Sequence, residues 1–147
     1  MKKLAFLVCV FLMISSQSNS QTASKLNDSE LNAAKVEFAR KFASDYLNKL
    51  KSGSYYNFQD EAIDPLKNQL TENTQKLIYK QLKMQFGDFQ SLEFAEAFSP
   101  DNNPAIVIYR FKGKFDKANE NLEIRVVLNE AGKIAGFWIK KWLDELT

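Results

Sequence analysis

The chain has 147 residues, with 20 lysine and arginine side chains against 18 aspartate and glutamate side chains, one cysteine and no histidine. The cysteine, Cys9, lies in a segment that we expect to be removed. Without Cys and His, the remaining chain cannot form disulfides, Ser-His-Asp triads or zinc sites of the usual Cys/His type. Asp, Glu, Lys and Tyr remain available for acid–base chemistry. The balanced charge lacks the basic excess of a nucleic-acid binder.

The first residues have the pattern of a secretion signal. Lys2 and Lys3 precede an unbroken apolar run over residues 4–14, and small polar residues follow. This order predicts a signal peptide over residues 1–20, cut before Gln21. At about 1.5 Å per residue, the run is too short to cross a hydrocarbon core of about 30 Å. We therefore expect an exported protein, periplasmic or secreted, without a membrane span.

The mature chain is expected to be one domain over residues 27–147, preceded by a flexible lead-in over 21–26. A long helix is predicted to begin at Asn27, which can cap it, because Glu30 three residues later can reach back to the cap. Gly53 is expected to end this helix. Its apolar side includes aromatic residues at helical spacing: Phe38, Phe42 and Tyr46.

Two shorter helices are predicted next. Asp64 is expected to cap the second helix, with Pro65 at its first position, and this helix runs through Leu70. Thr71 can cap a third helix, which Gly87 is expected to end. The three predicted helices thus lie between Asn27 and Gly87.

From Phe89 onward the apolar period changes to two, which is typical of β-strands. Short turn-rich connections separate the strands, and connections this short join antiparallel neighbours. Helices followed by strands predict an α+β domain in which three N-terminal helices pack on a curved four-stranded antiparallel meander. The predicted strands run over 89–98, 105–115, 122–128 and 133–142.

Several residues in and between these elements carry a resemblance to a known superfamily: Leu50, Gly53, Tyr55, Leu70, Thr71, Tyr79, Leu82, Gly87 and Phe89. The chain resembles the nuclear transport factor 2-like superfamily, which has a cystatin-like roll and includes ketosteroid isomerase and scytalone dehydratase. More narrowly, it resembles a family of small exported bacterial domains of unknown function within that group. The resemblance implies a cone-shaped roll with a ligand pocket at its open end and dimers formed through the sheets.

Aromatic residues are the candidates for a ligand pocket. A pocket is apolar with a few converging polar groups, and phenol hydroxyls fit that description. The alternative is that these rings fill the core between helix and sheet, with hydroxyls at its edge. The pocket candidates are Tyr55, Tyr79, Tyr109, Phe111 and Phe137, with Tyr56 beside them.

An acidic cluster, Asp60, Glu61 and Asp64, precedes Pro65. It could supply a general base or ligands for a hard cation. Its spacing matches no calcium loop, so a solvated loop is the alternative, and no metal or cofactor is predicted.

Two arginines, Arg110 and Arg125, fall in the middle of adjacent predicted strands. Together they could bind a carboxylate ligand. The alternative is pairing across the sheet surface with an acidic neighbour, for which the candidates are Glu93, Glu123 and Asp116.

The second predicted strand is apolar on both sides. Because alternate residues point to opposite faces, one helix layer can cover only one set. We expect Tyr109 and Phe111 to face the core, which leaves Ile106 and Ile108 outward, with Trp138 on the fourth strand as a further interface candidate. A patch of this kind marks an interaction surface or simply the exposed apolar area of a small domain. It predicts a homodimer.

The sequence therefore predicts an exported, non-catalytic domain that binds a small apolar ligand or a protein partner. One alternative is an isomerase-type enzyme with a carboxylate and a tyrosine in the roll cavity, although no motif assigns that pair to named residues. Another is an inhibitor or accessory subunit of an envelope hydrolase. The dehydratase chemistry of the superfamily cannot be transferred, because it relies on histidine.

Overall fold

The structure, a computed structural model, describes residues 22–146, so the predicted signal peptide lies outside the described residues. Helices and strands follow in the predicted order, with one additional strand at the start. The elements are β1 (Ala23–Lys25), α1 (Ala33–Lys51), α2 (Asp64–Gln69), α3 (Glu72–Phe86), β2 (Phe89–Pro100), β3 (Val107–Phe115), β4 (Leu122–Leu128) and β5 (Ile134–Lys141).

Helix α1 begins later than predicted. Its cap is Asn32, whose side chain accepts a hydrogen bond from the Lys35 backbone N–H at 3.1 Å. The predicted cap, Asn27, instead closes a separate turn in which its backbone N–H donates to the Glu30 carboxylate at 2.8 Å. The end of the helix is as predicted, because Gly53 follows the last turn with a φ of 78°.

The two shorter helices occupy the predicted segments. In α2 the cap position belongs to Ile63, and Asp64 lies in the first turn, where it pairs with Lys67 at 2.8 Å. The prediction that Asp64 caps α2 was therefore wrong. Thr71 caps α3 as predicted by accepting a hydrogen bond from the Thr74 backbone N–H at 3.3 Å.

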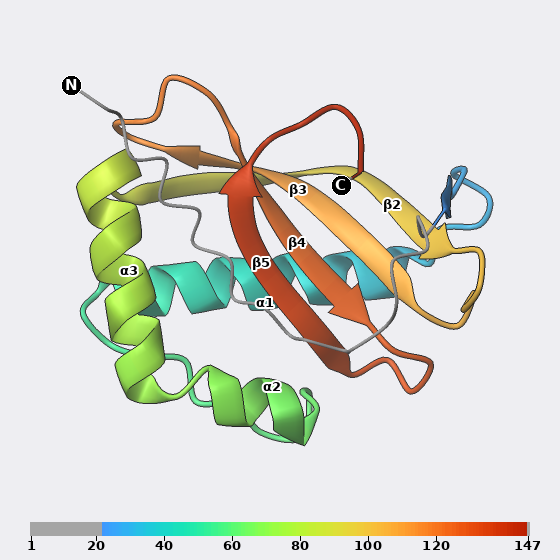
Figure 1. Cartoon of the computed structure of the whole chain (residues 1–147), viewed down its shortest axis with the longest axis horizontal. Helices are drawn as coiled ribbons and strands as arrows, with labels where there is room; N and C mark the ends of the chain where they lie inside the picture. The colour runs from blue at the N-terminus through green and yellow to red at the C-terminus, as the bar shows by residue number, and fades with distance from the viewer. Residues whose placement is uncertain (1–21, 147) are drawn as a thin grey trace.

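The sheet has five antiparallel strands in the order β1-β2-β3-β4-β5, rather than the predicted four (Figure 1). The additional strand lies in the segment predicted as a flexible lead-in, because Ala23–Lys25 pairs with the end of β2 from Phe98 to Pro100. The sheet does not close on itself, since β1 and β5 are its two edges. Among the described residues, no helix has the length and apolar character needed to cross a membrane.

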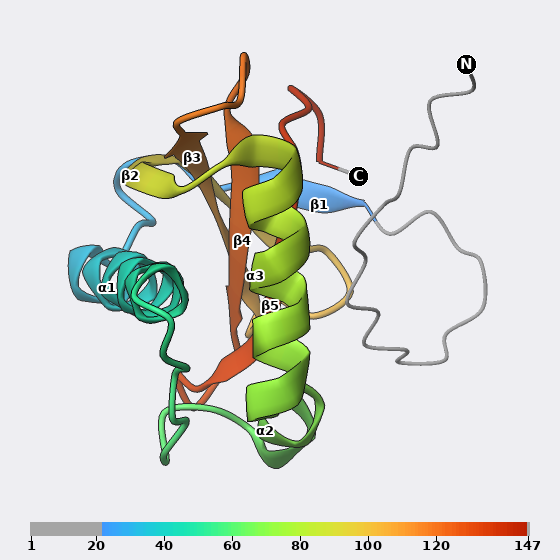
Figure 2. The ribbon, with the colours of Figure 1, turned by 90° about the vertical axis from the view of Figure 1, so that its left-hand side faces the viewer.

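Helix α1 lies on one side of the sheet, and the segment after β5 lies on the other (Figure 2). Tyr109 and Phe111 are buried in the core, as the alternation of β3 predicted. Ile108 and Arg110 therefore point to the opposite face, which we call the outer face. The core combines α1 residues such as Phe42 and Leu47 with the inner sides of the strands.

Candidate functional site

A cluster of aromatic rings fills the space between α1 and the sheet. Five rings contact one another with centroid separations from 4.8 Å to 6.3 Å. The shortest separation joins Tyr46 of α1 to Phe137 of β5. Such ring contacts stabilise a packed core. The cluster consists of Phe42, Tyr46, Tyr56, Phe58 and Phe137.

The predicted pocket residues lie in different environments in the structure. Tyr109 and Phe111 are buried, and Phe111 packs edge-on against Phe94 at 5.6 Å. Tyr55 is 39% exposed in the segment after α1. The hydroxyl of Tyr79 donates to the Asp88 carboxylate at 2.5 Å. This placement resembles the core-packing alternative more closely than a ligand pocket.

Two buried or half-buried tyrosines bear on the isomerase alternative. The Tyr46 hydroxyl is buried and has no hydrogen-bond partner among the described residues, and burial raises its pKa. Burial, with a smaller contribution from Glu61, raises the pKa of Tyr56 to about 12. Both phenols therefore stay protonated near neutral pH.

The carboxyl groups with shifted pKa values all shift in the same direction. Each of the five pKa values is lowered, for Asp88 chiefly because the Tyr79 hydroxyl donates to its carboxylate. A general acid that works near neutral pH needs a raised pKa. None of these five has one. The five carboxyl groups with a lowered pKa belong to Glu37, Asp64, Asp88, Asp101 and Glu123.

The predicted acidic cluster does not converge on one point. Asp64 pairs with Lys67, and Glu61 accepts hydrogen bonds from the Gln59 backbone N–H at 3.0 Å and 3.1 Å. Within residues 22–146, no group of three His, Cys, Asp or Glu side chains is placed to hold a metal ion.

The outer face of the sheet carries a buried network of charges. Arg110 has no exposed side-chain surface and pairs with Glu96 and, at 2.8 Å, with Glu123. Arg125 donates to the second oxygen of Glu123 at 2.6 Å, and Lys25 pairs with Glu96 at 2.8 Å. Of the predicted acidic partners, the structure uses Glu123, and it adds Glu96, which the sequence did not single out. These contacts match the cross-strand pairing alternative.

Residues after β5 cover the Arg110 guanidinium. Its central carbon lies 4.4 Å from the ring centroid of Trp142, and one of its N–H groups donates to the Leu143 carbonyl at 2.5 Å. Burial alone would raise the pKa of Glu123, but hydrogen bonds from Arg110 and Arg125 outweigh burial and lower it. The glutamate is therefore ionised inside the network.

Next to this network, apolar residues form a row across three strands of the outer face. Phe98 of β2 lies opposite Ile108 of β3, which lies opposite Val127 of β4, and all three are half-buried. We call these three residues the outer apolar row. Trp138 on β5 adjoins the outer apolar row. The Trp138 ring lies over Gly136, which is paired directly with Val127 on the neighbouring strand.

Ile106, the remaining interface candidate, is half-buried just before β3. It lines a pocket of about 490 Å³ between the turn before β3 and the turn before β5. The two predicted isoleucines therefore both have accessible surface.

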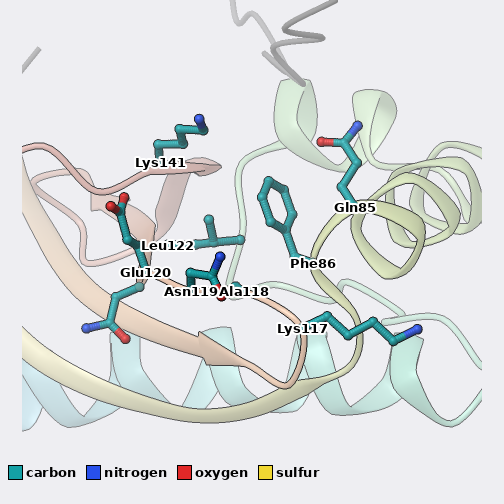
Figure 3. Close-up of a pocket in the computed structure, with 9 residues that line it drawn as sticks. Gln85, Phe86, Lys117, Ala118, Asn119, Glu120, Leu122 and Lys141 are labelled. Atoms are coloured by element: carbon teal, nitrogen blue, oxygen red, sulfur yellow. The ribbon is translucent and has the colours of Figure 1, made fainter. Parts of the chain in front are cut away.

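A second pocket, of about 330 Å³, lies where the end of α3 meets the β3–β4 turn and the end of β5 (Figure 3). We call it the α3 pocket. Phe86 and Leu122 lie toward its centre in Figure 3, with Gln85, Glu120 and Lys141 around them. None of the predicted pocket residues lines it. The full lining is Gln85, Phe86, Lys117, Ala118, Asn119, Glu120, Asn121, Leu122 and Lys141.

The wall of the α3 pocket is held by contacts around Gly87. The Lys117 backbone N–H donates to the Phe86 carbonyl at 3.0 Å. The Asp88 backbone N–H donates to the Asp116 carboxylate at 2.8 Å, and the Asp116 N–H donates to the Asp88 carbonyl at 3.0 Å. We call these three hydrogen bonds the α3 clasp. They fix the end of the helix to the β3–β4 turn.

Sequence reasoning found parts of this pocket only as secondary-structure features. Gly87 is predicted only as a helix end, and residues 116–121 only as the short connection between two predicted strands. Nothing in the local pattern indicated that the two segments meet, because they are distant in sequence. Lys141, from the end of β5, was likewise not a candidate.

The comparisons with known proteins give a family but no activity. The model of one family, described as "Protein of unknown function (DUF3887)", matches residues 43–137, which is well over half of the chain. The matched range contains the α3 clasp and most of the α3 pocket, whereas Lys141 lies beyond it. No curated protein and no solved structure is significantly similar to the chain. The expectation of a family of small domains of unknown function is thereby confirmed, and the chain belongs to the DUF3887 family.

Proposed function

We propose that the chain is an exported, non-catalytic domain with the cystatin-like roll of the nuclear transport factor 2-like superfamily, and that it binds a protein partner through the outer face of its sheet. The first partner we propose is a second copy of the chain. The observation that carries this proposal is the outer apolar row, which crosses three strands on the face opposite α1. Apolar patches on small domains mark interaction surfaces.

The charge network beside the row supports burial of this face. Burying an unpaired charge is costly, whereas a charge that already has its partners can be buried with a smaller penalty. Arg110 and Arg125 are matched by Glu96 and Glu123 within the same protomer. A partner that covers the outer face therefore does not have to supply compensating charges.

The packed interior supports a binding role for the surface over one for the roll interior. The aromatic cluster places its rings in direct contact, with Tyr46 and Phe137 separated by 4.8 Å. A small apolar ligand at this place would have to displace those side chains. The surface therefore offers the better binding site.

The test introduces a charge into the outer apolar row and measures oligomeric state by light scattering. Complete burial of an exposed isoleucine contributes roughly 1.5–3 kcal/mol, but Ile108 is already half-buried in the protomer. A symmetric dimer gains about half of that amount from each of two copies, so Ile108→Lys should weaken the dimer roughly 10- to 10²-fold. The variant should be a folded monomer by circular dichroism. Ser91→Lys is the matched control, because Ser91 is exposed on the same face at its far end.

Val127→Lys is a second variant in the same row and should behave as Ile108→Lys does. If the wild type is monomeric at high micromolar concentration, self-association through this face is wrong. If both lysine variants stay dimeric while folded, the dimer uses another surface.

A further inference from the structure

The α3 pocket presents hydrogen-bonding groups and apolar groups to the same small space. Its centre is apolar, formed by Phe86, Ala118 and Leu122. Its rim carries three side-chain amides, two ammonium groups and one carboxylate. All six of these polar side chains are exposed, so their hydrogen-bonding groups are accessible to a ligand. They are Gln85, Asn119, Asn121, Lys117, Lys141 and Glu120.

The charges around the pocket nearly cancel. Lys117 and Lys141 contribute positive charge, and Glu120 contributes negative charge. The pocket also meets the C-terminal end of α3, where the helix dipole adds a partial negative charge of roughly half a unit. A phosphate-like anion would face Glu120 and the helix end, and a polycation would face the two lysines. The balance favours a neutral ligand.

Amide side chains suit a ligand rich in hydroxyl groups. Each amide donates and accepts hydrogen bonds, and each hydroxyl does the same, so the two pair in either direction. Charged groups at the rim can also bind hydroxyls, since hydrogen bonds to ionised groups are the stronger ones. The apolar centre then needs a ligand with a compact apolar face. A pyranose ring has both features, because its hydroxyls project around a face of C–H groups.

We propose that the α3 pocket binds a neutral pyranose saccharide, with one ring over Phe86 and its hydroxyls on Asn119, Asn121 and the charged rim. The pocket volume of about 330 Å³ equals roughly eleven water molecules, which is room for one sugar ring. The α3 clasp holds the wall in place, so little ordering is needed on binding. This proposal is independent of the outer face, because the pocket lies at the opposite end of β4 from Val127.

The test is a two-dimensional amide NMR titration of the mature chain with two neutral probes, methyl β-glucopyranoside and the trisaccharide of N-acetylglucosamine. For a ligand of this size we expect a dissociation constant on the order of 1 mM. The expected result is a saturable shift of amides in residues 117–122 and at Phe86 with at least one probe. Tighter binding of the trisaccharide would identify a glycan chain as the source, and equal binding would identify a free sugar.

Variants establish the site. Asn121→Ala should weaken saccharide binding about fivefold through lost hydrogen bonds. Phe86→Leu keeps the apolar centre but removes the ring, and it should weaken binding by a similar factor. Asn73→Ala is the matched control, because Asn73 is an exposed amide in the first turn of α3, away from the pocket.

Three outcomes would overturn the proposal. The first is that neither saccharide shifts these amides at saccharide concentrations well above the expected dissociation constant. The second is that inorganic phosphate produces the shifts and the saccharides do not, which would make the pocket an anion site. The third is that Asn121→Ala and Asn119→Ala, both at exposed positions, bind the saccharides as the wild type does.

Discussion

Replacing Gly87 by alanine tests whether the α3 clasp contributes to stability. Gly87 follows α3 with a φ of 81° and a ψ of −154°, a backbone conformation that is essentially restricted to glycine. A Cβ added at this residue would lie 1.7 Å from an Asp116 carboxylate oxygen. The substitution therefore strains the backbone and also displaces the carboxylate that accepts from the Asp88 backbone N–H.

The expected loss of stability has two parts. Backbone strain of this kind costs about 1–3 kcal/mol. Losing a hydrogen bond to a charged group costs about 1.5–3 kcal/mol. Gly87→Ala should thus lower the free energy of unfolding by about 3–5 kcal/mol. Gly53→Ala is the matched control, because Gly53 also has a positive φ, 78°, but nothing lies within 4 Å of an added Cβ. It should lose only about 1–2 kcal/mol.

The assay is urea unfolding of both variants at 25 °C, with Asp116→Ala and the double variant completing a thermodynamic cycle. Because the clash requires Asp116, the double variant should lose less stability than the sum of the two single variants. The reasoning is refuted if Gly87→Ala and Gly53→Ala differ by less than about 0.5 kcal/mol, which is the usual limit of additivity.

Two further predictions follow from the charge network and from the start of the chain. The pKa of Glu123 is lowered in the folded protein, so its contribution to stability is present above its ordinary pKa near 4.5 and is lost as the pH falls through the folded value. Glu123→Gln should flatten the acid side of the stability profile measured by chemical unfolding between pH 2 and pH 7, and an unchanged slope would contradict the network. The intact mass of the protein from the native envelope or medium should correspond to a chain that begins near Gln21, and a full-length cytoplasmic species would contradict export.

Local patterns predicted the elements whose ends are determined locally. Thr71 and Gly87 bound α3 because a cap side chain and a glycine act within one turn of the helix. Strand β4 occupies the predicted residues 122–128, where apolar alternation is regular. The inward placement of Tyr109 and Phe111 follows from the same alternation.

Features that depend on distant partners could not be predicted in this way. Strand β1 has only three residues, Ala23–Lys25, without apolar alternation, and it is extended because it pairs with the end of β2. The residues around Asn27 match the pattern of a helix start, but in the structure they form only a single turn. Helix α1 begins later, with Asn32 as its cap. The burial of Arg110 depends on Trp142, which follows β5.

The α3 pocket was missed for a similar reason. Its lining comes from the end of a helix, a turn between strands and the end of the last strand. Each segment reads as an ordinary surface segment in the sequence. Polar side chains such as Asn119 and Asn121 acquire a common ligand space only when the α3 clasp brings the turn against Phe86. A single sequence contains no signal for that contact.

The cover over Arg110 has a consequence for proteolytic trimming of the chain. The carbonyl of Leu143 accepts a hydrogen bond from the guanidinium, although Leu143 follows Arg110 by 33 residues. Leu143 and Trp142 both come after the last of the five strands in the sequence. A protease that removed the residues after Lys141 would leave every strand in place but would open the guanidinium to water on one side. The outer face of the sheet is therefore complete only while the residues after β5 stay attached.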